Sequence, residues 1–276
     1  MAKEHESNRL AWNEAAAYYR AGLNESLELL SKGGMSFCPP EYRYLERYRA
    51  NLKTCIHLQC AGGTDSLSLM NYGANEVIGV DISEQMIEIA RKKSDALKHN
   101  ARWLVSDILQ IPSSMNATAD FVYTGKGAIN WIMDIGAWAR IIARLLKPGG
   151  VVYLFEGHPM TYCFDMQAKE LKLDSNYKGY FSNDPYPKQG WPDSYVGKLK
   201  KSESEQAFKY ERAWPVSSVI GGLLKAGLVL EEFQEHPDPF WVEFPNLPKA
   251  LRQLFPNTYS VVARKPHEST PGAGPS

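Results

Sequence analysis

Three short apolar segments, each followed by small or acidic residues, constrain the fold of this chain most strongly. The segments and the residues that end them are 54–58 before Gln59-Cys-Ala-Gly-Gly63, 76–80 before Asp81, and 101–105 before Ser106 and Asp107. The interval between consecutive segments holds one helix, as in a βαβ repeat. Parallel strands joined in this way form a sheet with helices on both faces. Ligands bind such sheets at the carboxyl ends of the strands, where these residues lie.

The remaining apolar segments extend this pattern to an α/β fold. We predict a doubly wound, mostly parallel seven-stranded sheet with an antiparallel last strand, the added strands lying at 120–123, 151–155, 228–234 and 259–264. Helices are predicted at 8–31, 41–49, 64–72, 135–146 and 216–226, with a further helix capped by Ser83. Asn8 is the expected N-cap of the first helix. Lys147-Pro-Gly-Gly150 is expected to separate the helix before it from the strand after it.

The same reading divides the chain into parts with different roles. These parts are an N-terminal helical extension (1–50), a cofactor-binding core (51–159), an insertion after the fifth strand (160–214), the rest of the core sheet (215–265) and a disordered tail (266–276). The insertion is polar but dense in aromatic residues, whereas disordered linkers are poor in them. We therefore expect the insertion to fold over the edge of the sheet.

Composition limits the partners of this chain. Lysine plus arginine and aspartate plus glutamate each number 31, so no overall field attracts nucleic acid or an acidic membrane. The chain has no apolar segment long enough to span a bilayer and no secretory signal at its start. Its four cysteines lack paired or zinc-binding spacing. We expect a cytoplasmic protein with reduced thiols and no metal, binding neither nucleic acid nor membrane; self-association into a homo-oligomer stays open.

The order of the strand-end residues favours one type of cofactor. A turn of small residues followed by Asp81 and Asp107 suits adenosine without a pyrophosphate, that is S-adenosylmethionine rather than NAD. These motifs, together with Gly79-Val-Asp-Ile82 and Leu145-Leu-Lys-Pro-Gly-Gly150, resemble those of class I S-adenosylmethionine-dependent methyltransferases. The His57-Leu-Gln-Cys60 form of the first motif is similar to that of bacterial enzymes that methylate small molecules. The resemblance implies methyl transfer from S-adenosylmethionine to a small-molecule acceptor.

The first loop departs from the pattern of that family, which reads acidic-x-Gly-x-Gly-x-Gly. His57 stands at the acidic position, and Gln59 and Ala61 stand at the first two glycines. Gly63 is kept and Gly62 is added beside it, so we expect the pocket to survive. The contact that the family's acidic residue makes to the amino group of the cofactor is in doubt. The departure argues more strongly against NAD, whose pyrophosphate needs the full glycine turn.

Specific residues follow from this alignment. Asp81 is predicted to accept hydrogen bonds from the ribose hydroxyls and Asp107 from the adenine amino group, with a helix cap and a loop carboxylate as the respective alternatives. The full set of predicted cofactor-binding residues is His57, Gln59, Ala61, Gly62, Gly63, Asp81, Ile82, Met86, Ser106, Asp107, Ile108, Tyr123 and Thr124.

The catalytic and substrate-binding residues rest on position alone. His158 emerges after the fifth strand and is the candidate general base, with a structural hydrogen-bonding role as the alternative. The insertion is expected to cover the substrate through Tyr186, Trp191 and Tyr195, and Tyr18 and Tyr19 are further candidates. The alternative is that these aromatic residues form a core within the insertion.

Two other functions remain open from the sequence. A methyltransferase acting on RNA or protein would present a basic open rim, which the neutral charge balance disfavours. A non-catalytic binding partner with this fold is favoured only by the irregular loop at Gln59 and Ala61. Binding of S-adenosylhomocysteine and methyl transfer distinguish these functions.

Overall fold

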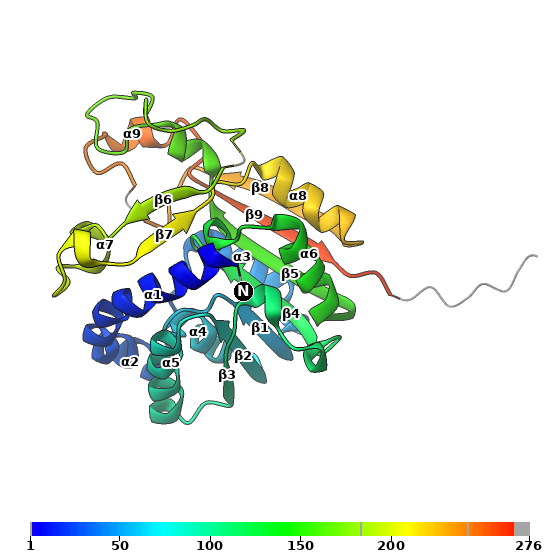
Figure 1. Ribbon diagram of the computed structural model, residues 1–276. Coiled ribbons are helices and arrows are strands. Elements are labelled where there is room, and N and C mark those ends of the chain that lie inside the picture. The colour runs from blue at the N-terminus through cyan, green and yellow to red at the C-terminus, as the bar shows by residue number, and fades with distance from the viewer. Residues whose placement is uncertain (1, 183, 242, 268–276) are drawn as a thin grey trace, which may run out of the picture.

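Seven strands of the chain form one sheet at the centre of the molecule (Figure 1). The computed structural model describes residues 2–182, 184–241 and 243–267. The strands lie in the order β3-β2-β1-β4-β5-β9-β8. Their bounds are β1 Thr54–Leu58, β2 Glu76–Asp81, β3 Ala101–Val105, β4 Ala119–Gly125, β5 Leu146–Gly157, β8 Val229–His236 and β9 Thr258–Arg264. Only β9 of these runs antiparallel to its neighbours, β5 and β8, so the predicted sheet is confirmed.

Alternate residues of each central strand face two separate cores. On one face Ile56, Val122 and Val152 pack in a cluster with helices α6 (Ile135–Leu145) and α8 (Val216–Lys225). On the other face Phe121 and Tyr153 pack with helices α3 (Pro39–Arg47) and α4 (Thr64–Tyr72). A strand buried on both sides reads as a continuous apolar run, which explains why these strands were visible in the sequence.

Helix α5 (Glu84–Leu97) starts where the sequence places it. The Ser83 hydroxyl accepts a hydrogen bond from the backbone N–H of Met86, as an N-cap does. The Lys147-Pro-Gly-Gly150 segment differs from expectation, because α6 ends at Leu145 and strand β5 begins at the next residue. Gly149 adopts a φ of 79° inside that strand. The segment is therefore part of β5 rather than a separate loop.

The N-terminal extension also differs from expectation. It contains two helices, α1 (Lys3–Ala21) and α2 (Leu23–Ser31), with a break at Gly22. Asn8 is not an N-cap, since the helix has already begun five residues earlier. Its side chain instead bonds both backbone groups of Tyr210, donating to the carbonyl at 2.9 Å and accepting from the N–H at 2.7 Å. Asn8 therefore forms long-range hydrogen bonds to Tyr210 in place of the predicted local capping bond.

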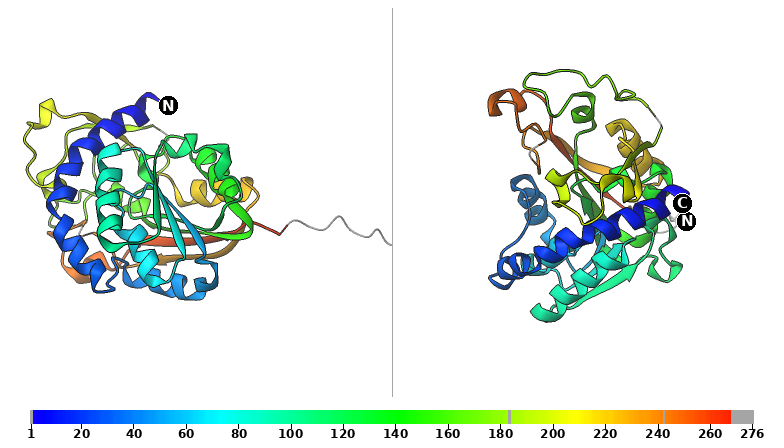
Figure 2. Two further views of the ribbon diagram at one scale, coloured as in Figure 1. Left: turned by 90° about the horizontal axis from the view of Figure 1, so that it is seen from below. Right: turned by 60° about the vertical axis from the view of Figure 1, so that its left-hand side comes forward.

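The insertion folds as a small unit beside α1. It contains an antiparallel pair of strands, β6 (Tyr186–Gln189) and β7 (Phe208–Glu211), and the short helix α7 (Asp193–Val196). Figure 2 shows this hairpin lying along α1, and the cluster of Ala11, Ala15, Trp191 and Val196 joins the two. A further short helix, α9 (Lys249–Arg252), follows β8. The remaining 3₁₀ turns lie at Arg49–Asn51, Ile108–Gln110, Ser113–Met115, Ile129–Trp131, Pro159–Cys163 and Glu203–Glu205.

Two further expectations concern the membrane and the chain end. No helix within the described residues is both long and apolar enough to cross a bilayer. Of the predicted tail 266–276, residues 268–276 lie outside the described residues.

Candidate active site

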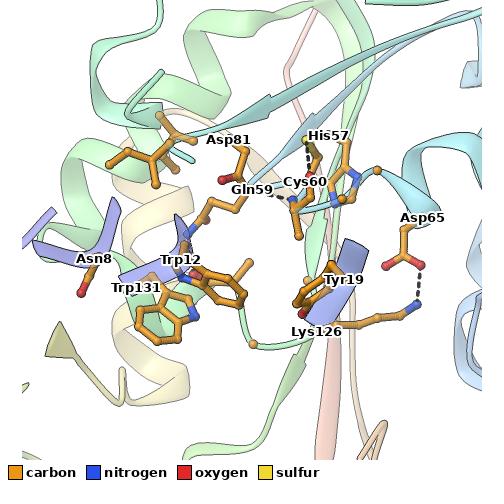
Figure 3. A pocket seen from close by; sticks show the side chains of 18 of the residues that line it. Asn8, Trp12, Tyr19, His57, Gln59, Cys60, Asp65, Asp81, Lys126 and Trp131 are labelled. Atoms are coloured by element: carbon orange, nitrogen blue, oxygen red, sulfur yellow. Dashed lines mark hydrogen bonds and ion pairs between the residues drawn. The ribbon is translucent and has the colours of Figure 1, made fainter. Parts of the chain in front are cut away.

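A cavity of about 260 Å³ opens at the carboxyl ends of β1, β2 and β4, with α1 along one side (Figure 3). Strand β1 lies between β2 and β4, so the direction of strand succession reverses at this point of the sheet. Such a switch point is where open α/β sheets bind ligands, because the loops on either side diverge. Most of the predicted cofactor-binding residues line this cavity, namely His57, Gln59, Ala61, Gly62, Gly63, Asp81, Ile82, Asp107 and Ile108.

The first loop has left-handed backbone at all three positions where the family pattern has glycine, although only Gly63 is a glycine. Gln59, Ala61 and Gly63 adopt φ values of 57°, 45° and 76°, so all three positions are left-handed. For a residue with a side chain this conformation costs on the order of 1 kcal/mol. At Gly63 an added Cβ would also lie 2.6 Å from Trp103 and 2.7 Å from Ala90, so a glycine is required there. The loop geometry therefore tolerates substitution at the first two positions at the expense of strain.

Asp81 connects strand β2 to this loop. One carboxylate oxygen accepts from the backbone N–H of Ala61 at 2.8 Å, and the other accepts from that of Ser83 at 2.9 Å. Burial raises the pKa of Asp81 to about 6, against the lowering effect of these backbone bonds. Each carboxylate oxygen has a second lone pair. The carboxylate can therefore accept two further hydrogen bonds from a ligand in the cavity.

Asp107 is held by a residue that the sequence did not reveal, His5 on α1. His5 Nδ1 lies 2.8 Å from Asp107 Oδ2, and both side chains are buried. The other ring nitrogen, Nε2, accepts from the backbone N–H of Met133, so Nδ1 carries the proton and donates to Asp107. Burial acts to raise the pKa of Asp107, but the interactions with His5 and the bond from the backbone N–H of Leu109 together outweigh it, and the pKa is lowered. Asp107 therefore stays ionised, and α1 closes over this end of the cavity.

An ion pair lines the opposite end of the cavity from Asn8 (Figure 3). Lys126 Nζ lies 3.0 Å from Asp65 Oδ1 and also donates to the carbonyl of Ser36. Burial acts to raise the pKa of Asp65, but Lys126 and a hydrogen bond from the Ser36 hydroxyl lower it overall. This ion pair was not predicted from the sequence. Its only local signals are that Asp65 follows the glycine loop and Lys126 follows the fourth strand.

His57 is neutral where the family has an acidic residue. Its Nδ1 lies 2.7 Å from the hydroxyl of Ser66, and its ring packs edge-on against Tyr123. Burial lowers the pKa of His57 to about 4. The negative charge near this position is therefore that of Asp65.

Gln59 leaves one acceptor unused. Its amide nitrogen donates to the carbonyl of Ala128 at 2.7 Å, which ties the first loop to the loop after β4. Its amide oxygen is buried and has no hydrogen-bond partner among the described residues. An unpaired buried acceptor costs about 1–3 kcal/mol. Because Gln59 lines the cavity, a ligand that donates a hydrogen bond there would remove this cost.

Aromatic side chains from four parts of the chain line the cavity. They are Trp12 and Tyr19 on α1, Trp131 after β4, Tyr195 in the insertion and Trp241 after β8. The rings of Trp12 and Trp131 are 5.1 Å apart and edge-on, and those of Tyr195 and Trp241 are stacked at 4.3 Å. We call these five residues the aromatic wall. They give the cavity an apolar side, which faces the charged residues at the strand ends.

Four predicted cofactor-binding residues lie outside the cavity lining. Met86 packs in the cluster between α5 and α1, and the Ser106 hydroxyl donates to the carbonyl of Asp107. The Tyr123 hydroxyl is not part of the cavity lining and donates to a carboxylate oxygen of Glu41 at 2.6 Å. Thr124 is fully buried, and its hydroxyl has no partner within the described chain. The alternation of side chains along β4 explains the last two, since backbone proximity to the cavity does not aim the side chains into it.

His158 also lies away from the cavity lining. Its Nε2 lies 3.0 Å from a Glu235 carboxylate oxygen, and its Nδ1 accepts from the backbone N–H of Met160. Burial lowers the pKa of His158, although Glu235 opposes this. The ring is thus engaged at both nitrogens in the turn after β5, and its position does not support the expected role as a base.

The predicted substrate residues separate into two groups. Tyr19 and Tyr195 line the cavity. Trp191 is buried against α1, where its indole N–H donates to the carbonyl of Ala11. Tyr18 is half exposed, and the Tyr186 hydroxyl bonds the carbonyl of Asn176 within the insertion. The insertion thus uses part of its aromatic content for packing, as the alternative reading anticipated.

Comparison with known families places this chain among methyltransferases. A family model described as a methyltransferase domain matches residues 56–150. A demethylmenaquinone methyltransferase of Lactococcus lactis is 32% identical over 188 residues, covering 66% of this chain and 68% of that protein. One from Staphylococcus saprophyticus is 36% identical over 109 residues, covering 38% of this chain. This chain spans 46% of the length of the Staphylococcus protein, less than half.

Solved structures share the fold. An S-adenosylmethionine-dependent methyltransferase from Mesorhizobium loti has a TM-score of 0.56 at 19% identity, covering 81% of this chain and 97% of that one. A geranyl diphosphate C-methyltransferase from Streptomyces coelicolor, in complex with Mg²⁺, geranyl diphosphate and S-adenosyl-L-homocysteine, has a TM-score of 0.53 at 13% identity. The latter match covers 82% of this chain and 78% of that one.

Proposed function

This chain belongs to the class I S-adenosylmethionine-dependent methyltransferases, and on that premise we propose that it methylates a small organic molecule. The observation that carries the proposal is the cavity at the switch point of the sheet, with Asp81 and Asp107 at the ends of adjacent strands. When bound, the cofactor supplies a methyl group already activated by its sulfonium. The task of the protein is therefore to hold the acceptor in line with that methyl group and to exclude water.

The donors and acceptors of the cavity fit this cofactor. Asp81 would accept from the ribose hydroxyls and Asp107 from the adenine amino group. At the other end of the cavity, Asp65 is an acceptor for an ammonium group, and Lys126 is a cation for a carboxylate. An ion pair is complementary to the zwitterionic end of an amino acid. The neutral His57 supplies no charge there, so Asp65 takes over the negative charge of the missing acidic residue.

Neither of the two histidines among the described residues that line the cavity is a strong general base. His5 is engaged at both ring nitrogens, and His57 is a weak base with a pKa of about 4. An acceptor that reaches the site with a lone pair or a readily ionised group needs no base from the protein. This favours acceptors such as ring carbons of electron-rich quinols, phenolates and neutral amines over alcohols.

For the acceptor itself, we propose a flat, electron-rich ring of the quinol type. Two findings support this choice: the aromatic wall of the cavity, which suits a planar ring, and relatives described as demethylmenaquinone methyltransferases. A diphosphate-bearing acceptor is disfavoured. The one lysine or arginine among the described residues that line the cavity is Lys126, and Asp65 already neutralises it.

Calorimetry with S-adenosylhomocysteine tests the cofactor assignment. We expect the unmodified protein to bind it, and Asp81→Ala to weaken binding at least tenfold, because ribose hydroxyls would lose a charged acceptor. Asp95→Ala, which changes an exposed aspartate on α5, is the matched control and should bind as the parent does. Binding should also weaken as the pH falls through about 6, where Asp81 becomes protonated. Equal binding by Asp81→Ala and the parent would contradict the assignment.

Methyl transfer from labelled S-adenosylmethionine then tests the acceptor. A panel of naphthoquinols, phenols and aliphatic amines separates the ring class from the others. Cofactor binding without methylation of any small molecule, RNA or protein in such a panel would favour the non-catalytic alternative. Methylation of amines alone would contradict the quinol proposal but not the methyltransferase function.

A further inference from the structure

Lys93 is a buried cation behind the first loop of the cavity. It lies within α5, and its side chain is almost fully buried, at 1% exposure. Its ammonium group donates to the carbonyl oxygen of Gly62 at 2.9 Å and to the hydroxyl oxygen of Thr64 at 2.7 Å. Both partners are neutral oxygen atoms. Burial of an ammonium group is costly without a partner of opposite charge, so the position calls for an explanation.

The two partners of Lys93 flank Gly63, the loop residue that cannot carry a side chain. Gly63 packs so closely on Trp103 and Ala90 that a Cβ would clash with both. Lys93 donates hydrogen bonds to the residues immediately before and after Gly63. The loop is thereby held against α5 and β3, and its residues 59–64 also line the cavity.

The loop needs such support because of its strained residues. Gln59 and Ala61 hold left-handed φ values that glycine would adopt without strain. Two other contacts act on these residues directly: Asp81 accepts from the Ala61 N–H, and the Gln59 side chain donates to Ala128. Lys93 completes the set by fixing the C-terminal half of the loop, where α4 begins.

We propose that Lys93 is a positioning residue for the cofactor: it holds the 59–64 loop, despite the side chains at two glycine positions, in the shape that lines the cavity. The ligand named in this inference rests on the proposed function, but the effect on the loop does not. Removing the ammonium group should leave the carbonyl of Gly62 unpaired and let Ala61 relax toward ordinary φ values. The loop then loses the backbone geometry that a bound ligand would contact.

Lys93→Met tests this role with a side chain of similar length and no charge. Lys92→Met is the matched control, since Lys92 is the preceding residue, is half exposed and pairs with Glu88 on the surface. In the protein without ligand, we expect Lys93→Met to speed hydrogen exchange of the backbone amides at residues 60–63. We expect its affinity for S-adenosylhomocysteine to fall on the order of tenfold. Lys92→Met should change neither quantity.

A second substitution separates positioning from general stability. Ala61→Gly removes the strain at the position where the loop would relax, so Lys93→Met combined with Ala61→Gly should regain most of the lost affinity. A merely structural lysine would behave differently. Its loss would lower the unfolding temperature of both variants and leave the affinity of the folded protein unchanged.

The outcomes distinguish this inference from the proposed function. If the unmodified protein fails to bind S-adenosylhomocysteine, the proposed cofactor is wrong, and amide exchange alone decides the role of Lys93. If the parent binds but Lys93→Met exchanges and binds as the parent does, the inference is wrong. Should Lys93→Met not fold, Lys93→Gln keeps a polar side chain at this position but is uncharged and one bond shorter, so it cannot replace both hydrogen bonds of the lysine. Faster exchange confined to residues 60–63 is again the required result. Unchanged exchange in that variant overturns the inference.

Discussion

Helix α1 and the insertion at 160–214 both lie over the carboxyl edge of the sheet, but they contribute unequally to the cavity. Four residues of α1 line it: His5, Asn8, Trp12 and Tyr19. Among the described residues of the insertion, Tyr195 alone does so. From the sequence we expected the insertion to contribute more cavity residues than α1, because the insertion is dense in aromatic residues. Aromatic content is therefore a poor guide to which segment covers a site.

The difference follows from the geometry of the two segments. Residues spaced by three, four and seven along a helix lie on one face, so a long helix can place side chains along the whole length of a cavity. The elements of the insertion are short: one antiparallel strand pair, the four-residue helix α7 and the 3₁₀ turn at Glu203–Glu205. Of its aromatic residues, Trp191 packs against α1 and donates to the carbonyl of Ala11, whereas Phe164 packs on Phe255 and Trp214 joins the core of the sheet. The insertion thus acts as a support for α1.

Of the substitutions that compare α1 with the insertion, we expect Trp12→Ala on α1 to cause the largest loss of stability and turnover. The Trp12 ring contacts those of Trp131 and Trp191 at centroid distances of 5.1 and 5.0 Å, so its loss opens the centre of the cluster. We expect the free energy of unfolding to fall by about 3 kcal/mol. Turnover should also fall strongly, because the acceptor loses its enclosing wall. Chemical denaturation and methyl-transfer assays measure the two effects.

Tyr186→Ala in the insertion is the matched comparison for Trp12→Ala. Its side chain lies on the hairpin outside the cavity lining, and its hydroxyl makes one long hydrogen bond at 3.4 Å. We expect a change in unfolding free energy of less than about 0.5 kcal/mol and unchanged turnover. An equal loss of turnover in the two variants would break the distinction between helix and insertion.

The next largest effect is a loss of cofactor affinity in His5→Ala, which removes the contact of α1 with Asp107. The remaining carboxylate loses its buried donor and the end of α1 loses its anchor. We expect affinity for S-adenosylhomocysteine to fall by roughly three- to tenfold, equivalent to about 1 kcal/mol. Calorimetry measures this, with Lys3→Ala as the control on the same helix. Unchanged affinity would mean that α1 covers only the acceptor side of the cavity.

A smaller and more selective effect is expected from Tyr195→Ala. This residue is the contribution of the insertion to the aromatic wall, and it stacks on Trp241 at 4.3 Å. Stacking of this kind is worth about 0.5–1.5 kcal/mol, so the KM for the acceptor should rise several-fold while cofactor affinity stays constant. Steady-state kinetics and calorimetry separate the two. A loss of cofactor affinity instead would assign Tyr195 to the cofactor side.

The smallest effect on the reaction is expected from His158→Ala. The imidazole is paired with Glu235 and lies away from the cavity lining. We expect turnover to keep its pH profile, with at most a modest loss of stability from the broken hydrogen bonds. A rate loss that high pH restores would instead support His158 as a base and would require the turn after β5 to move.

Much of the fold could be predicted because its central strands β1, β2, β4 and β5 are buried on both faces and the segments between strands have helical patterns. Strands β1 and β3 and helix α4 have the bounds expected from the sequence, and Ser83 caps α5 as predicted. The strand-end residues Asp81 and Asp107 likewise line the cavity, since a parallel sheet gathers the ends of its strands at one edge. Asn8 is not the predicted N-cap, because its hydrogen bonds depend on a residue that is distant in the sequence. Its side chain found a partner 202 residues away, which no local pattern could signal.

The loop at Gln59 and Ala61 likewise depends both on its own sequence and on residues that are distant in the chain. The sequence indicated a departure from the glycine pattern, but not that both residues keep the left-handed conformation. That conformation is held by side chains from β2 and α5, Asp81 and Lys93, which are near neighbours only after folding. Strain in a loop cannot be read from its own residues when other elements oppose it.

By itself, the sequence determined the layered sheet, because hydrophobic periodicity is a local property. It also placed acidic residues at the strand ends that line the cavity. Only the tertiary structure decided which segment closes the cavity. The contacts responsible, His5 with Asp107 and Asn8 with Tyr210, join residues 102 and 202 positions apart. Their partners are chosen by how whole elements pack, so neither spacing nor composition could reveal them.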